Sequence, residues 1–171
     1  MLIRNYGLFW RSRDVHWGHG GHLKGVASST AAPVDFREQQ GVYVLYDEAF
    51  QLVYVGQAGA GEEQRLFARL KQHRRDQLSE RWSRFSWYGI NPATKNGGLR
   101  MEKYAANVPI PGVLDHLEAI LITAAEPRHN RQGGRFGEKV TQYFQFRDAE
   151  KLGPTSDQMI RDIYDWTGTK V

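Results

Sequence analysis

The chain has 171 residues, of which 40% are hydrophobic and 25% charged, a balance typical of a globular protein rather than a disordered one. At this length we expect a single domain over 1–171 with its own core. No run of about 18 apolar residues is present, so no membrane span is predicted. The first residues lack the apolar segment of a signal peptide, so we expect a cytoplasmic protein. The absence of cysteine excludes disulfides and thiolate zinc sites.

Positive charge is concentrated in one part of the chain. The whole chain has a net charge of +4, whereas residues 65–84 hold seven cations against two acids. Clustered cations favour a polyanionic partner, because each neutralised phosphate releases bound counterions. Taken alone, however, such a run more commonly marks a solvated helix face.

The first 40 residues are rich in aromatic residues and glycine. Leu8–Trp10 and Val15–Trp17 are two short aromatic runs, and they predict a hairpin packed on the core. Three histidines lie in a glycine-rich stretch: His16, His19 and His22. Three imidazoles raise the hypothesis of a zinc site, but neither a cysteine nor a properly spaced acid accompanies them. A loop is therefore the preferred interpretation.

The next segment carries the clearest pattern in the chain. Two β-rich apolar runs, Val42–Tyr46 and Leu52–Val55, flank a polar break, which is typical of a β-hairpin. Tyr43 lies near the start of one strand and Tyr54 near the end of the other, so we expect them to come close across the antiparallel pair. Two glycines beside them are expected to allow close approach of the backbone: Gly41 and Gly56.

Hydrophobic periodicity predicts further helices and strands beyond the hairpin. A helix is expected over 62–77, and it carries Arg65, Arg69 and His73 on one face because they recur every four residues. The remaining elements are expected in this order: a strand over 84–90, a long polar connection over 91–112, a helix over 113–125, a strand over 140–146 and an amphipathic helix over 156–166.

Glu118 is the most unusual acid in the chain. It lies in the helix expected over 113–125, whose buried side is predicted to carry four apolar residues: Leu114, Leu117, Leu121 and Ala124. A carboxylate in such apolar company costs several kcal/mol unless it is paired or bound to a cation. Glu118 is therefore a candidate metal ligand, with a salt-bridged structural acid as the alternative.

The order of these residues matches a known pattern. Two tripeptides stand on the expected hairpin strands, Gly41-Val42-Tyr43 and Tyr54-Val55-Gly56, and four residues follow downstream: Arg69, His73, Glu118 and Asn130. This pattern resembles the GIY-YIG nuclease family, most closely its restriction-endonuclease-like branch. The resemblance implies an α+β fold with a small central mixed or antiparallel sheet flanked by helices. It makes 41–135 the catalytic core, with 1–40 as an N-terminal extension and 136–171 as a C-terminal strand and helix.

The resemblance implies a divalent-metal-dependent endonuclease that hydrolyses DNA phosphodiester bonds, of restriction or defence type. One Mg²⁺ (or Mn²⁺) per active site is implied on Glu118, since Mg²⁺ keeps most of its waters and is completed by substrate phosphate. Tyr43 is implied as general base together with His73. For Tyr43 to act as a base at pH 7, its pKa of about 10 would have to be lowered by roughly three units. Arg69 is implied to hold the scissile phosphate. Two residues complete the implied set, one to order the water or bind phosphate and one to brace the site: Tyr54 and Asn130.

DNA is the expected partner, contacted by basic residues near the implied site: Arg65, Lys71, Arg74, Arg128 and Arg131. Cutting both strands of a palindrome needs two active sites, so a homodimer or paired monomers on the substrate are expected. One alternative is a non-catalytic nucleic-acid-binding module on the same scaffold, which the intact set of six residues disfavours. Another is a DNA-repair or RNA-cleaving nuclease of the same family.

Overall fold

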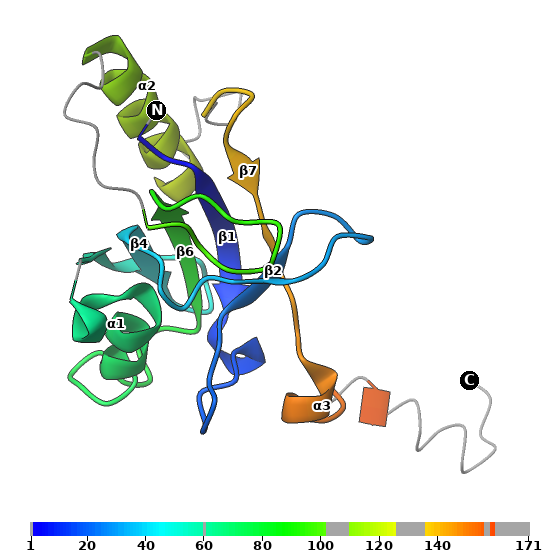
Figure 1. Cartoon of the computed structure of the whole chain (residues 1–171). Helices are drawn as coiled ribbons and strands as arrows, with labels where there is room; N and C mark the ends of the chain where they lie inside the picture. Colours follow the sequence, from blue (N-terminus) through cyan, green and yellow to red (C-terminus); the bar gives the residue numbers. More distant parts are fainter. Residues whose placement is uncertain (1, 60, 102–109, 126–135, 156–157, 160–171) are drawn as a thin grey trace, which may run out of the picture.

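The computed structural model describes residues 2–59, 61–101, 110–125, 136–155 and 158–159. They form an α+β protein around a five-stranded mixed sheet with the strand order β5-β4-β6-β1-β7 (Figure 1). β1 and β7 pair in parallel, whereas the other neighbours in this sheet are antiparallel. The elements follow in chain order: β1 (Asn5–Arg11), η1 (Ser12–Asp14), β2 (Lys24–Val26), β3 (Val34–Asp35), β4 (Gly41–Tyr46), β5 (Leu52–Ala58), η2 (Glu62–Gln64), α1 (Leu66–His73), β6 (Arg84–Gly89), α2 (Ile110–Ala125), β7 (Thr141–Gln142), β8 (Phe144–Gln145) and α3 (Ala149–Leu152).

The predicted hairpin is confirmed as β4 and β5. The two strands pair antiparallel, with Tyr43 opposite Gly56 and Leu45 opposite Tyr54. The Asp47 carboxylate closes the turn by accepting a backbone N–H at 2.8 Å, the kind of bond that makes aspartate a turn residue. Because side chains alternate along a strand, this register puts Tyr43 and Tyr54 on the same face of the sheet.

α1 covers the face of the sheet that carries the two tyrosines. Leu66 and Leu70 of α1 are buried there against a cluster rich in aromatic side chains: Trp10, Phe36, Tyr43, Phe85 and Trp87. The predicted strand over 84–90 is confirmed as β6, which lies between β4 and β1. The predicted helix over 62–77 is shorter than expected. Arg65 has extended backbone angles that separate the turn η2 from α1, and α1 ends at His73.

α2 packs on the opposite face. Ala119 and Ala124 are buried there beside Val44, Tyr46 and Tyr88. The Tyr46 hydroxyl donates to the carbonyl of Ala124 at 2.9 Å, which ties the helix to β4. In the described part of the chain, no helix has the length and apolar character needed to cross a membrane.

The predicted helix over 113–125 is thus present, but the prediction of its buried side is largely wrong. Leu117 is 47% exposed and Leu121 is 66% exposed, whereas Ala124 is buried as expected. The side chain of Leu114 lies outside the described residues. Small residues face the sheet because they let the helix approach the large rings of Tyr46 and Tyr88 closely. Glu118 is exposed, so it does not sit in the apolar environment that was expected.

The first 40 residues contribute a strand to the main sheet. β1 pairs with β6 along most of its length and with β7 at its start, and Trp10 is only 2% exposed. The predicted hairpin between the two aromatic runs is therefore wrong. Residues 15–17 instead approach residue 22 through an isolated bridge between His16 and His22.

The predicted strand over 140–146 is divided between two sheets. β7 extends the five-stranded sheet, while β8 pairs with β2 in a small sheet of order β3-β2-β8. Tyr143 lies at the crossing and is buried, and its backbone N–H donates to the carbonyl of Tyr6 at 2.7 Å. The predicted helix over 156–166 lies almost wholly outside the described residues.

The packing of α2 makes a testable distinction between its two faces. Replacing Ala119 with leucine should destabilise the protein by about 1–3 kcal/mol, because added methylenes overfill a closed interface. The matched change Leu121→Gln, on the exposed face, should alter stability by less than about 0.5 kcal/mol. Urea unfolding of both variants checks this. The reverse order of effects would mean that the leucine face of α2 rests on the sheet.

Candidate functional site

The structure brings together four of the predicted catalytic residues. Tyr43 and Tyr54 project from the hairpin towards His73 at the end of α1. The Tyr54 ring centroid lies 4.8 Å from that of His73 and 6.2 Å from that of Tyr43. Tyr43 is fully buried, whereas Tyr54 on the edge strand is half-buried. The two phenols and the imidazole therefore form one group, with Tyr54 on its accessible side.

Two glycines shape this group, as predicted. A side chain at Gly56 would collide with the phenol of Tyr43, its cross-strand partner, so the Tyr43 ring lies directly over the backbone of β5. Gly41 has a φ of +147°, and a Cβ there would collide with the carbonyl of Tyr88 on β6. Both positions require glycine because neighbouring groups approach the backbone closely.

A chain of hydrogen bonds runs from Tyr43 into the turn after α1. The Tyr43 hydroxyl lies 2.8 Å from His73 Nε2, and His73 Nδ1 lies 2.7 Å from Asp76 Oδ2. The carboxylate accepts the Nδ1–H, which leaves Nε2 as the acceptor for the Tyr43 hydroxyl. The backbone N–H of Leu78 donates to the other Asp76 oxygen at 2.8 Å and fixes the carboxylate in place.

Asp76 is a member of the site that the sequence analysis missed. Its position three residues after His73 was the signal that could have indicated a contact between the two side chains. It was overlooked because the turn that aims its carboxylate back at the ring lies beyond the last residue of α1.

Burial and charge act in opposite directions on the pKa values of Tyr43 and Asp76, the two ends of this hydrogen-bonded series. Burial raises the pKa of Tyr43 above its ordinary value, although the charge and hydrogen-bonding side chain of Arg69 lower it. Partial burial also raises the pKa of Asp76, but the Leu78 N–H, His73 and Arg69 outweigh it, so its pKa lies below the ordinary value. The expectation of a Tyr43 whose pKa is lowered is therefore wrong for the free protein. The site holds a neutral phenol and a charged carboxylate.

Arg69 supplies the positive charge beside this hydrogen-bonded series. It lies on α1 one turn before His73, is half-buried, and donates from Nη1 to Gln72 Oε1 at 2.7 Å. Its charge acts on both Tyr43 and Asp76. The guanidinium thus sits where an anion approaching the Tyr43 hydroxyl would meet it.

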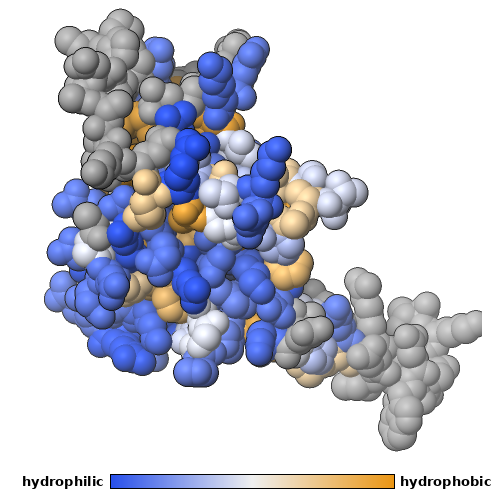
Figure 2. All heavy atoms as spheres, viewed as in Figure 1, coloured by the Kyte–Doolittle hydropathy of each residue, from blue (hydrophilic) through white to orange (hydrophobic). Residues whose placement is uncertain are grey.

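The predicted nucleic-acid contacts on α1 have different surroundings, on a surface that is mostly hydrophilic (Figure 2). Arg65 is 15% exposed and its Nε lies 3.9 Å from a Glu38 carboxylate oxygen, so part of its charge is used within the protein. Lys71 Nζ lies 5.8 Å from the centroid of a phenylalanine ring one turn earlier. The exposed Arg74 stacks over the Trp17 ring at 4.8 Å. Lys71 and Arg74 remain available to a polyanion.

Glu118 is not brought to the other four residues. It is exposed on α2, the helix that packs on the opposite face of the sheet from α1 (Figure 1). Among the residues that the structure describes, no group of three or more histidine or acidic side chains is placed to hold a metal ion. Three of the predicted site residues lie outside the described residues: Arg128, Asn130 and Arg131.

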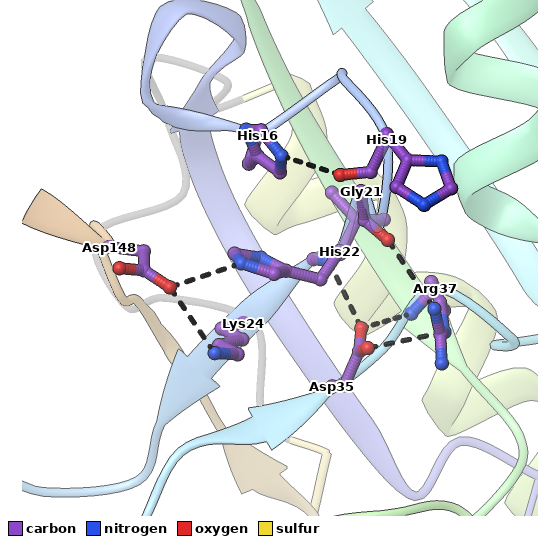
Figure 3. A network of polar contacts seen from close by, with 9 residues as sticks. His16, His19, Gly21, His22, Lys24, Asp35, Arg37 and Asp148 are labelled. Carbon is purple, nitrogen blue, oxygen red and sulfur yellow. Dashed lines mark hydrogen bonds and ion pairs between the residues drawn. The ribbon is translucent and has the colours of Figure 1, made fainter. Parts of the chain in front are cut away.

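The histidine-rich stretch holds the N-terminal segment to the C-terminal one. Figure 3 shows the His22 ring directed at Asp148, with Nε2 and Oδ2 3.2 Å apart, and Lys24 on the same carboxylate. His16 donates from Nε2 to the backbone carbonyl of His19 at 3.0 Å, while the His19 ring points away from the other two imidazoles (Figure 3). The His16 and His22 rings, with centroids 5.6 Å apart, thus bond to different partners.

Comparison with profiles of known protein families, with curated protein sequences and with solved structures found no match to this chain. The resemblance to the GIY-YIG nucleases therefore rests on the residues themselves and on the geometry of the hairpin and α1.

The hydrogen bonds of Asp76 predict a pH-dependent contribution to stability. Replacing Asp76 with asparagine should cost about 1–2 kcal/mol at neutral pH, because a partly exposed charged acceptor is removed. Since the folded protein lowers the pKa of this carboxyl, the stabilisation is complete above its ordinary value of 3.8 and disappears as the pH falls through the folded value.

Urea unfolding of both proteins from pH 7 downwards measures this difference. Glu80→Gln, which removes an exposed acid from the same connection, is the control and should show no such trend. A stability gap between the wild type and Asp76→Asn that stays constant below pH 3.8 would contradict the assignment.

Proposed function

We propose that the chain is a divalent-metal-dependent endonuclease of the GIY-YIG fold that hydrolyses phosphodiester bonds in DNA. The observation that carries the proposal is the hydrogen-bonded series Tyr43–His73–Asp76 beside Arg69. It supports hydrolysis because it joins a proton acceptor to a fixed positive charge at one place. The excess of cations over acids in residues 65–84 supports a nucleic acid as the substrate.

The series acts as a proton relay. The attacking water gives its proton to the Tyr43 oxygen while the phenolic proton passes to His73 Nε2, and the charged Asp76 stabilises the imidazolium that forms. This route avoids a free phenolate, which would cost at least about 4 kcal/mol at pH 7 even without burial. As the water oxygen bonds to phosphorus, the bond from phosphorus to the 3′ oxygen breaks, and the released 3′ oxygen takes up a proton from solvent. In this proposal Tyr54, the half-buried ring beside Tyr43, orders the attacking water.

Arg69 balances the charge of the phosphate. In the pentacoordinate transition state, negative charge builds up on the non-bridging oxygens, and a guanidinium held in place stabilises it without rearrangement. Arg69 is held by Gln72 and lies on the same face as the relay. A bidentate contact to the phosphate would also align it with the attacking water.

The metal site is less well supported. The resemblance nominates Glu118 for Mg²⁺ or Mn²⁺, and a single carboxylate is chemically enough because the cation keeps its waters and takes up substrate phosphate. The place of Glu118 on the far side of the sheet does not fit a shared site with Tyr43 and Arg69. No step of the relay is therefore assigned to the metal.

That placement favours a second candidate, a non-catalytic nucleic-acid-binding module that retains the scaffold. Such a module would bind DNA through the basic surface over α1 and leave it uncut. A plasmid-nicking assay distinguishes the two functions. The proposed enzyme cuts supercoiled plasmid with Mg²⁺ and stops in EDTA, whereas the binding module retards the plasmid but leaves it intact in both.

The relay and its cation predict the effects of two substitutions on nicking. Arg69→Ala should lower the rate by about 10²–10³, the usual loss for one charge-stabilising donor. His73→Gln should lower it strongly, because an amide cannot take up the phenolic proton as the imidazole does. The matched control is Arg75→Ala, an exposed cation of the following turn, which should cut like the wild type. An Arg69 variant with wild-type rate would place Arg69 outside the site.

Glu118 has its own test. If it holds the metal, Glu118→Gln abolishes nicking while binding of a labelled DNA duplex is unchanged. This is the result that the resemblance predicts, whereas the position of Glu118 on the far side of the sheet predicts no loss of nicking. Nicking at the wild-type rate by this variant, in metal-free buffer with Mg²⁺ added back, would agree with its exposed position on α2 and remove it from the site.

A further inference from the structure

A cavity of about 690 Å³ lies beside the candidate site and is lined by none of its predicted catalytic residues. Arg11 and Arg13, at the end of β1 and in η1, line it side by side with residues 82–84, because Arg11 and Arg84 are cross-strand partners. The cavity shares the end of α1 with the site, because Arg74 lines it directly after His73. The Trp82 indole N–H donates to the carbonyl of His73 at 3.3 Å and couples the two places.

The charge of the cavity favours an anion. Four arginines line it against a single acid, Glu48: Arg11, Arg13, Arg74 and Arg84. The acid next to Arg13 does not offset this excess, because the Asp14 carboxylate is paired with Arg147 at 3.3 Å. Guanidinium groups over a partly apolar wall bind phosphate more strongly than they would in open water.

Two polar atoms in the cavity wall have no hydrogen-bond partner. They are Ser83 Oγ and Arg84 Nε, which are buried and adjacent in the chain. The Arg84 guanidinium lies over the Phe50 ring at 4.4 Å, a contact that leaves Nε unbonded. Buried donors are almost always paired in folded proteins. Both atoms are shielded from solvent, however, so they lie behind the surface of the cavity and not on it.

Aromatic side chains form the rest of the wall. Trp17 and Trp82 both line the cavity, with ring centroids 6.4 Å apart. The volume falls within the range of pockets that enclose a whole small molecule, rather than a groove that touches one phosphate. Tryptophan with arginine is the combination that holds a base outside a double helix, by stacking and by charge.

We propose that this cavity binds one unpaired nucleotide of a nucleic-acid strand, with its phosphate on the arginines and its base on Trp17, in place of the Arg74 side chain that covers that ring. The inference rests on the proposed nucleic-acid substrate but not on cleavage. It gives the first 40 residues a role in substrate recognition, because Arg11, Arg13 and Trp17 all come from them. The strand that enters the candidate site would be held at a second point, next to α1.

Binding in EDTA tests the proposal without cleavage. The probe is a fluorescein-labelled oligothymidylate of about 12 nucleotides, a typical length for single-strand sites, followed by anisotropy. The double variant Arg11→Ala/Arg13→Ala should weaken binding at least about tenfold. It should also make the logarithmic dependence of affinity on salt shallower by about 0.7 for each phosphate that the protein no longer neutralises. The control, Arg75→Ala/Arg81→Ala, removes the same charge from exposed residues outside the cavity and should bind nearly as the wild type.

Two further probes show what the cavity holds. An abasic strand of the same length keeps the phosphates and should bind more weakly than oligothymidylate, and the matching duplex should lose little affinity in the Arg11/Arg13 variant. The indole NMR signals of Trp17 and Trp82 should move on addition of oligothymidylate to the wild type, but not to that variant. Equal losses in both double variants, or unmoved indole signals, would overturn the proposal.

The outcome is separable from that of the proposed function. A protein that binds oligothymidylate through Arg11 and Arg13 but cuts no DNA would contradict the nuclease and keep the cavity assignment. A protein that nicks plasmid while the Arg11/Arg13 variant binds oligothymidylate normally would contradict the cavity assignment alone. Thermal unfolding of both double variants should match the wild type, because all four arginines are exposed.

Discussion

The candidate site depends on the hydrogen bond between the Tyr43 hydroxyl and His73 Nε2, 2.8 Å long. It joins the hairpin to α1 inside the core, where removal of either partner would leave a buried polar group unsatisfied. Gly56 makes room for the phenol and Asp76 fixes the imidazole, so each end of the bond is determined by a separate element. The position of Arg69 follows, because it lies on the same helix one turn earlier.

Burial of Tyr43 decides what kind of chemistry the site can support. A phenol with a raised pKa is a poor base by itself, since a phenolate in the core would lack solvation. In the proposed function the same phenol passes a proton on, because its hydroxyl is hydrogen-bonded to an imidazole that a carboxylate holds in place. The site therefore favours a concerted transfer, in which charge resides on the His73–Asp76 pair.

The two faces of the sheet differ in what they carry: the candidate site lies on one face, and helix α2 packs on the other. The face under α1 carries the relay, Arg69 and, at its edge, the arginine-lined cavity, with Trp82 linking the cavity wall to His73. The face under α2 is joined to the sheet by alanines and by the Tyr46 hydroxyl. A nucleic acid engaged at the first face would contact neither Glu118 nor the exposed leucines of α2.

Local sequence patterns were sufficient for the elements whose contacts are local. The hairpin followed from two apolar runs around Asp47, and its register then placed Tyr43 and Tyr54 on one face. The four-residue spacing of Arg69 and His73 placed both on the side of α1 that meets them. Helical spacing could not predict the position of the Asp76 carboxylate, because Asp76 lies beyond the end of α1, where a turn sets the direction of its side chain.

Contacts between distant segments could not be read from periodicity. The leucines of α2 repeat at helical spacing, yet the side of the helix that carries Ala119 and Ala124 packs on the sheet, beside Tyr46 and Tyr88. The pairing of β1 with β6, and the cavity that residues 11–13 and 82–84 line side by side, join parts of the chain far apart in sequence. A repeat reports which residues share a face, but which face is buried depends on the shape and volume of the surface that meets it.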